Sequence, residues 1–181
     1  MSSPTADVSV RIAWGDDAAA IAALQVRTWQ EQYAGLVPAE ALPTDVAAAT
    51  AAWQESLRKP QDARNRVLGA LERNRVVGFT ITGPGSDPDC DPVADGELQE
   101  ITVAPEERGK GHGSRLLQAA IDTLLADRFT RAVTWTIATD DALRVFLSEA
   151  GWAPDGAHRT LDLDGSGTTL VKQVRLHTAF S

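Results

Sequence analysis

Gly109, Gly111 and Gly113 alternate with other residues between a strand-like segment and a helix-like one. Glycine lets the backbone pass close to a ligand, and a helix that starts directly after such a turn leaves its first amide groups unpaired. Unpaired amides at a helix N-terminus bind anions, and the neighbouring Arg108 and Lys110 add positive charge. The turn therefore predicts a polyphosphate site. The alternative is a plain tight turn whose glycines only cap the helix.

The spacing of these residues argues against two common phosphate-binding motifs. A P-loop needs Gly-x-x-x-x-Gly-Lys-Ser/Thr, but the Gly-Lys pair at 109–110 is followed by Gly111 and has no glycine five residues before it. The dinucleotide fingerprint needs a glycine where Ser114 stands, and it normally lies in the first strand-helix unit of a chain. What remains is an Arg-x-x-Gly-x-Gly motif that begins at Arg108 and follows a strand ending in Val103-Ala104-Pro105.

At these residues the sequence resembles the GNAT superfamily, the acyl-CoA-dependent N-acetyltransferases. The stretch 101–114, followed by Leu116-Leu117, is similar to that family's pyrophosphate-binding motif. Ala150-Gly151-Trp152 resembles the Gly-Phe/Trp ending of the family's next helix, and the order of elements is similar along nearly the whole chain. The resemblance implies an α/β fold with a mixed, mostly antiparallel sheet of about six or seven strands and helices on both faces. It also implies an N-acetyltransferase that transfers an acetyl group to a primary amine by direct attack in a ternary complex.

The resemblance implies that acetyl-CoA is the acyl donor and that no metal takes part. The backbone amides of the turn would bind the pyrophosphate, and the main chain of the strand at 101–103 would bind the pantetheine arm. Asp140 stands where the family usually has an asparagine that contacts the cofactor, and the alternative is that Asp140 only caps its helix. The expected cofactor-binding residues are Ile101, Thr102, Val103, Arg108, Gly109, Lys110, Gly111, His112, Gly113, Ser114 and Asp140.

Acyl transfer to an amine needs a base, because an amine of pKa ~8–10 is mostly protonated at neutral pH. Glu97 and Glu100 lie on the strand that leads to the turn. They are three positions apart, and because successive side chains alternate between faces, a regular strand would point them to opposite faces of the sheet. We favour Glu100 as the catalytic base, because it is nearer the expected thioester region. The alternative is that Glu100 is a solvent-exposed residue without a catalytic role. Glu97 is the second candidate, or it marks the polar start of the strand.

The other candidate site residues leave two questions open. The family's usual thiolate acid is a tyrosine four residues before the glycine that ends the helix, and here that position holds Leu147. The thiolate would then take its proton from water, from the amine or from a side chain such as Ser148, and a non-catalytic acyl-CoA-binding sensor or assembly module is the alternative function. Trp29 and Tyr33 have helical spacing, so they are either core aromatics or, by the resemblance, substrate-binding residues of the acceptor pocket.

A mixed series of elements must position these groups. Period-two alternation predicts strands, and apolar residues three and four apart between capping residues predict helices. The expected strands are 8–14, 67–71 and 76–81 as a hairpin, 98–103, 132–138, 159–163 and 170–176; the expected helices are 16–35, 43–59, a long one after 114, and 141–150. The strand-turn-helix-strand segment at 98–138 predicts a parallel crossover within an otherwise antiparallel sheet.

The length of 181 residues predicts one domain, with tails at 1–7 and 178–181 and an N-acetyltransferase-like domain at 8–177. No segment has the pattern of a signal peptide or a membrane span, so we expect a cytoplasmic protein. The balance of 17 Lys and Arg against 25 Asp and Glu gives a charge of −8, which opposes nucleic-acid binding and favours an amine partner, either a small molecule or a peptide. The resemblance makes a homodimer plausible.

The segment Asp87-Pro88-Asp89-Cys90-Asp91 has the alternating carboxylates of a calcium loop. Pro92 stands where such a loop needs glycine, and Leu98 stands where it needs glutamate. We therefore expect an acidic surface loop there. Cys90 is the single cysteine of the chain and has no histidine partner nearby, which disfavours a covalent enzyme intermediate.

Overall fold

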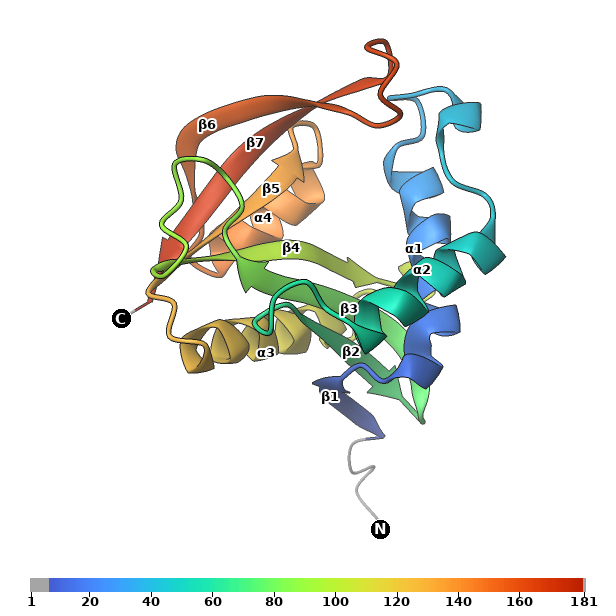
Figure 1. Cartoon of the computed structure of the whole chain (residues 1–181), viewed down its shortest axis with the longest axis horizontal. Helices are drawn as coiled ribbons and strands as arrows, with labels where there is room; N and C mark the ends of the chain where they lie inside the picture. The colour runs from blue at the N-terminus through green and yellow to red at the C-terminus, as the bar shows by residue number, and fades with distance from the viewer. Residues whose placement is uncertain (1–6, 181) are drawn as a thin grey trace.

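A seven-stranded sheet forms the centre of the protein in a computed structural model that describes residues 7–180 (Figure 1). The strands lie in the order β1-β2-β3-β4-β5-β7-β6, and every neighbouring pair is antiparallel except β4 and β5. The mixed, mostly antiparallel sheet is therefore the one predicted. Its members are β1 (Val8–Ile12), β2 (Arg66–Glu72), β3 (Arg75–Pro84), β4 (Asp95–Val103), β5 (Arg131–Ile137), β6 (Ala153–Asp162) and β7 (Leu170–Ala179).

Four helices cover the two faces of this sheet, as predicted. They are α1 (Ala18–Gln32), α2 (Val46–Arg58), α3 (His112–Ala126) and α4 (Asp141–Glu149), with three short 3-10 helices at Gly15–Asp17, Ala39–Ala41 and Pro105–Glu107. On one face α1 and α2 pack over β3. The rings of Trp53 and Phe79 meet there edge to face, with 5.6 Å between the ring centres. On the other face α3 and α4 share a core that contains Leu117 and Leu147. No described helix is long and apolar enough to cross a membrane.

Two glycines let α3 lie directly against the sheet. A Cβ at Gly78 of β3 would come within 2.7 Å of the Thr102 carbonyl oxygen and 3.1 Å of the Leu116 side chain. A Cβ at Gly96 of β4 would come within 2.6 Å of the Leu124 side chain. Because any larger side chain would push the helix away, these glycines set the position of α3, and with it the position of the turn that precedes α3.

The parallel strands β4 and β5 pair over only three positions, Asp95–Glu97 against Arg131–Val133. A further link is made by the Thr134 hydroxyl, which donates to the Leu98 carbonyl at 2.7 Å. Beyond this point β4 continues to Val103 in pairing with β3 alone, while β5 continues in pairing with β7. The edge of β4 that faces β5 thus has unpaired backbone groups that a ligand can satisfy.

A bulge in β4 corrects one expectation about its side chains. Ile81 pairs with Glu100 and Thr82 pairs with Leu98, so Gln99 is the extra residue of the pair. The extra residue reverses the alternation, and the Glu100 side chain contacts α1 while Leu98 faces the core under α3. Glu97 therefore shares the α1 face with Glu100, and the prediction of opposite faces was wrong because it assumed a regular strand.

Some element boundaries also differ from the predictions. Pairing extends β3 to Pro84 and starts β4 at Asp95, so the loop between them covers only 85–94. Strand β7 runs to Ala179, and the amide of Phe180 donates to the Thr130 carbonyl at 2.9 Å. The domain boundary at 177 was therefore too early, because the residues predicted as a tail complete the pairing with β5. Residues 1–6 of the predicted N-terminal tail lie outside the described residues.

Candidate active site

A cavity of about 500 Å³ lies where β4 and β5 diverge. Its walls come from the end of β4, the start of α3, the start of α4 and one side of α1. Six of the predicted cofactor-binding residues line this cavity: Ile101, Thr102, Val103, Arg108, Gly113 and Asp140. The unpaired edge of β4 and the N-terminus of α3 therefore open into one space, and an elongated ligand that ends in phosphates can reach both.

The glycine turn has the backbone geometry that the anion-site prediction needs. Gly109 and Gly111 adopt φ values of +79° and +85°. These values lie in the left-handed region of backbone conformations, which residues with a side chain rarely adopt. Helix α3 begins at His112, directly after Gly111, so the amides of residues 112–114 have no carbonyl one turn earlier in the helix to bind. Gly113 lies beside the Phe146 ring at the cavity wall, where a Cβ would be 3.5 Å from that ring.

The side chains of the turn are arranged differently from the prediction. The Lys110 ammonium donates to Glu107 at 2.8 Å, and Arg75 donates to the same carboxylate at 2.6 Å. These two cations, hydrogen-bonded to the carboxylate, lower the pKa of Glu107 to about 2. His112 is only 2% exposed, and its Nε2 lies 3.3 Å from the Glu72 carboxylate. The expectation that His112 binds the cofactor can therefore apply only to its backbone amide, because its ring packs into the protein below the turn.

Two arginines remain beside the phosphate end of the cavity. Arg108 lines the cavity and forms an ion pair with Glu31 of α1 at 3.2 Å. Arg115 folds back over the turn and donates to the Lys110 carbonyl at 3.3 Å. Ser114 is exposed in the first turn of α3. Positive charge at this end of the cavity therefore comes from Arg115 and from Arg108, which is paired with Glu31, while Lys110 shares the Glu107 carboxylate with Arg75.

Asp140 combines the two roles that the sequence left as alternatives. Its carboxylate accepts a hydrogen bond from the Leu143 amide at 3.1 Å, which caps α4. The residue also lines the cavity next to Thr139. Because one carboxylate oxygen is engaged by the cap, the other is the group that a ligand at this position would meet.

Sequence reasoning missed the contribution of α1 to the cavity. Thr28, Glu31 and Gln32 form one wall, opposite the end of β4. These residues lie more than sixty positions before β4 in the chain, and no local pattern links them to the turn. Only the packing of α1 across the sheet places them there.

The Glu100 carboxylate is occupied by three donors. Gln25 and Trp29 of α1 donate to it at 2.8 and 3.1 Å, and Thr102 donates at 3.3 Å. Burial raises the pKa of Glu100, and the three hydrogen bonds oppose that rise. The carboxylate thus fastens α1 to β4, and three of its roughly four acceptor positions are already used, which leaves little room for it to act as a base.

Glu97 has a different environment. Its side chain lines a second cavity, of about 300 Å³, together with Ser86, Gln99, Trp135 and Arg159. Glu97 is 7% exposed, and the Ser86 hydroxyl donates to its carboxylate over a long 3.4 Å. Burial raises the pKa of Glu97 to about 7, and the nearby Asp87 charge adds to the rise. At neutral pH the group is therefore close to half ionised, which suits a general base.

The acidic loop at 85–94 lies at the surface, as predicted, and is anchored beside this second cavity. The Asp87 carboxylate accepts hydrogen bonds from Trp135 Nε1 at 2.9 Å and from Arg175 at 3.0 Å. Arg175 also contacts Asp89 and Asp155, both at 2.6 Å. Because the guanidinium is buried and bonded to three carboxylates, it fixes the loop to β7 and keeps Asp87 near Glu97.

Three of the remaining predicted residues, Trp29, Tyr33 and Leu147, belong to the protein core. The Trp29 and Tyr33 rings meet edge to face at 6.1 Å, and Tyr33 packs on Ile137 at the cavity wall. Burial, followed by the charge of Glu100, raises the pKa of Tyr33. Leu147 is fully buried in the core under α3, whereas Ser148 is exposed on α4. The structure thus gives Leu147 a packing role and places Ser148 away from the cavity.

Comparisons with known proteins agree with this architecture. A model of the acetyltransferase (GNAT) family matches residues 20–152. An N-acetyltransferase from Staphylococcus aureus Mu50 is 19% identical, with a TM-score of 0.71 over 96% of this chain and 99% of the other. The PaiA N-acetyltransferase from Thermoplasma acidophilum, in complex with coenzyme A, is 16% identical, with a TM-score of 0.73 over 99% and 100% of the chains.

A third similar structure is YncA from Salmonella typhimurium, described as a putative acetyltransferase with its cofactor acetyl-CoA, at 16% identity and a TM-score of 0.68 over 97% and 95% of the chains. No curated protein matches the sequence. At these identities the structures show the shared fold, and the family model supplies the sequence match. The match runs through the glycine turn and both strands that diverge beside it. The resemblance expected from the sequence is therefore confirmed, and the chain belongs to the acetyltransferase (GNAT) family.

Proposed function

We propose that the protein is an N-acetyltransferase that moves an acetyl group from acetyl-CoA to a primary amine. One observation carries the proposal: consecutive residues of the two diverging strands line both cavities. Residues 101–103 of β4 and Ile137 of β5 border the larger one, and residues 97–99 and Trp135 border the smaller one. A ligand lying along β4 from the glycine turn would therefore have its far end next to Glu97.

The residues present fit coenzyme A. The free amides at the start of α3 and the Arg108 guanidinium suit its pyrophosphate, and the unpaired edge of β4 at 101–103 suits the amides of the pantetheine arm. Two of the similar structures contain coenzyme A or acetyl-CoA, which supports the same donor here. When bound, acetyl-CoA supplies a thioester whose carbonyl carbon accepts the amine.

In the proposed mechanism Glu97 is the base, directly or through a water molecule, in place of the initially favoured Glu100. The reason is access, because the Glu97 carboxylate faces a cavity while Glu100 holds three donors. Glu97 takes one proton from the ammonium form of the acceptor, the N–C bond forms and the C–S bond breaks. The nitrogen then loses its second proton, which the thiolate takes up through solvent. Burial and the charges of Asp87 and Asp95 raise the pKa of the Cys90 thiol, so Cys90 is a poor nucleophile for a covalent route.

Calorimetric titration tests the binding half of the proposal. Coenzyme A should bind the parent protein, and Gly113→Val should weaken binding at least tenfold, because the new side chain would occupy the space between Val103 and Phe146 at the cavity wall. Gly69→Val on β2 is the matched control, since a Cβ there meets no atom within 4 Å. Equal affinity of a folded Gly113→Val variant and the parent would contradict the placement of the site.

Release of free thiol from acetyl-CoA in the presence of primary amines tests the chemical half. The parent should turn over at least one amine, and Glu97→Gln should lower kcat by roughly 10²–10⁴-fold at neutral pH with little change in coenzyme A affinity. Binding of acetyl-CoA without turnover of any amine would instead support the acyl-CoA sensor, which the absence of a tyrosine at position 147 makes the second candidate.

A further inference from the structure

The second cavity contains groups of opposite charge within about 300 Å³. Glu97 comes from β4, and Arg159 comes from the edge strand β6. The charge of Arg159 opposes the rise in pKa of both Glu97 and Tyr33, so the guanidinium lies within electrostatic reach of both side chains. A cavity of this size is at the small end of those that hold small-molecule ligands. It therefore suits a compact ligand that carries both a positive and a negative group.

Arg159 is held in a fixed orientation with part of its guanidinium available. Its Nε donates to Gln173 at 2.7 Å, and the guanidinium stacks on the Trp135 ring at 4.2 Å from the ring centre. Its Nη1 forms a long ion pair, 3.9 Å, with Asp87 Oδ1, while Asp87 Oδ2 accepts the shorter hydrogen bonds from Trp135 and Arg175. The Arg159 side chain lines the cavity and is 40% exposed, so a ligand can reach it. A guanidinium presented in this way can bind a carboxylate through two parallel hydrogen bonds.

We propose that the acceptor is a free α-amino acid whose carboxylate is bound by Arg159 while its amine lies against Glu97. The proposal rests on the N-acetyltransferase function given above and specifies the substrate of that same site. In an α-amino acid the two groups are attached to one carbon, so both can be bound within a cavity of this size. The reaction then joins the acetyl group to the α-nitrogen and releases coenzyme A, with the amine proton taken up by Glu97.

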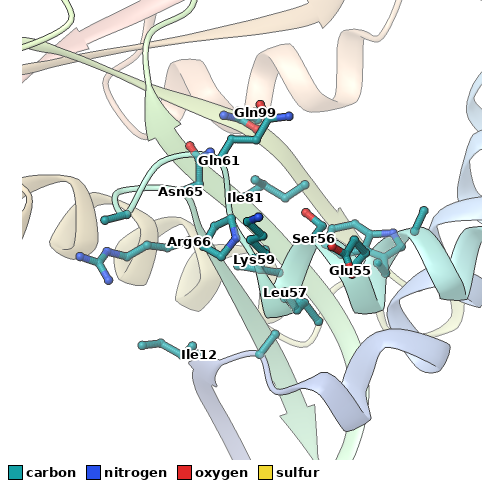
Figure 2. A pocket seen from close by; sticks show the side chains of 16 residues that line it. Ile12, Glu55, Ser56, Leu57, Lys59, Gln61, Asn65, Arg66, Ile81 and Gln99 are labelled. Atoms are coloured by element: carbon teal, nitrogen blue, oxygen red, sulfur yellow. The ribbon is translucent and has the colours of Figure 1, made fainter.

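The same charges disfavour other acceptors. The N-terminus of a peptide has an amide in place of the carboxylate, so Arg159 would lose its partner and keep its desolvation cost. A polyamine would bring a second cation close to Arg159. Space for the acceptor side chain lies beyond Gln99, which also borders a groove of about 960 Å³ between α2 and strands β2 and β3. Figure 2 shows Gln99 at the end of this groove near Asn65 and Gln61.

The test compares acceptors that differ only in the carboxylate. Thiol release would be measured for phenylalanine, methionine and lysine, for their amides, and for the amines that lack the carboxyl group. The amino acids should show kcat/KM about 10- to 100-fold above their amides, because a hydrogen-bonded charge pair is lost with the amide. The amides have amines of lower pKa and are intrinsically more reactive at neutral pH, so a preference for the acids must come from the protein.

Variants of Arg159 then locate the preference. Arg159→Gln should raise KM for amino acids and remove their advantage over amides with little change in kcat, and Arg159→Lys should keep part of it. Lys172→Gln is the matched control, because it removes one positive charge from β7 next to Gln173 and lies outside both cavities in the described structure. Calorimetric titration of each acceptor into protein saturated with coenzyme A gives a readout of binding without turnover.

The outcomes separate the two proposals. Preferred turnover and binding of amino acids, lost in Arg159→Gln and kept in Lys172→Gln, would support the inference. Turnover of amides or simple amines as efficient as that of the amino acids, or a preference that Arg159→Gln leaves intact, would overturn the inference and leave the N-acetyltransferase proposal standing. Failure to acetylate any amine of the panel would overturn both.

Discussion

Replacing Glu97 by glutamine should make the protein more stable at alkaline pH while it impairs catalysis. Glu97 is 7% exposed, and its pKa is raised from 4.5 to about 7 by burial and by the Asp87 charge. The folded protein therefore holds the Glu97 proton more tightly than the unfolded chain does. Glutamine has nearly the shape of protonated glutamate and carries no charge at any pH, so it removes the cost of burying the ionised form.

The sign and size of the effect follow from proton linkage. Between pH 4.5 and about 7 the folded state binds more protons than the unfolded state, so the contribution of Glu97 to the free energy of unfolding falls as the pH rises. Each tenfold change in proton affinity is worth about 1.4 kcal/mol, so the rise from 4.5 to about 7 corresponds to about 3 kcal/mol when complete. The stability gain of Glu97→Gln should be near zero at pH 4.5 and reach about 3 kcal/mol at pH 8.

Urea unfolding of parent and variant at several pH values between 4.5 and 8 measures this difference. The pH effects of the other titrating groups are common to both proteins and cancel when one free energy is subtracted from the other. Glu149→Gln, at an exposed site on α4, is the matched control and should show no such pH-dependent gain. A difference between parent and Glu97→Gln that stays constant over the whole pH range would refute the reasoning, because the carboxylate would then not be ionised against its burial.

The other predictions concern the supports of the site. Asp87→Asn removes the second cause of the raised pKa of Glu97, so the acidic limb of the profile of kcat/KM against pH should move to lower pH. An acidic limb at the same pH as in the parent would show that the Asp87 charge does not act on Glu97. Arg175→Met removes the nearest cation from the carboxylates of Asp87 and Asp155 and should cost about 3–5 kcal/mol in urea unfolding, whereas an unchanged midpoint would show that the network contributes little. Gly111→Val forces a branched side chain to φ +85° and should cost about 1–3 kcal/mol and abolish coenzyme A binding, as calorimetry would detect.

The sequence alone determined the local features of the protein. The alternating glycines, the helix cap at Asp140 and the hairpin of 67–71 and 76–81 depend on neighbours in the chain, and they appear where their patterns predict them. The order of strands and helices and the parallel crossover follow from the same local periodicities and from the handedness of strand connections. The glycine turn, where we propose that the phosphates bind, lies within one such local segment, and so its position was predictable.

Tertiary structure decided which side chains do the proposed chemistry. The bulge at Gln99 turns Glu100 toward α1, where Gln25 and Trp29 bind its carboxylate, and the diverging strands leave Glu97 facing a cavity. Arg159 reaches the same cavity from an edge strand some sixty residues later in the chain. Burial, charge pairing and access depend on residues that meet only when the sheet is assembled, and the pKa and orientation of a carboxylate follow from these neighbours and not from its place in the sequence.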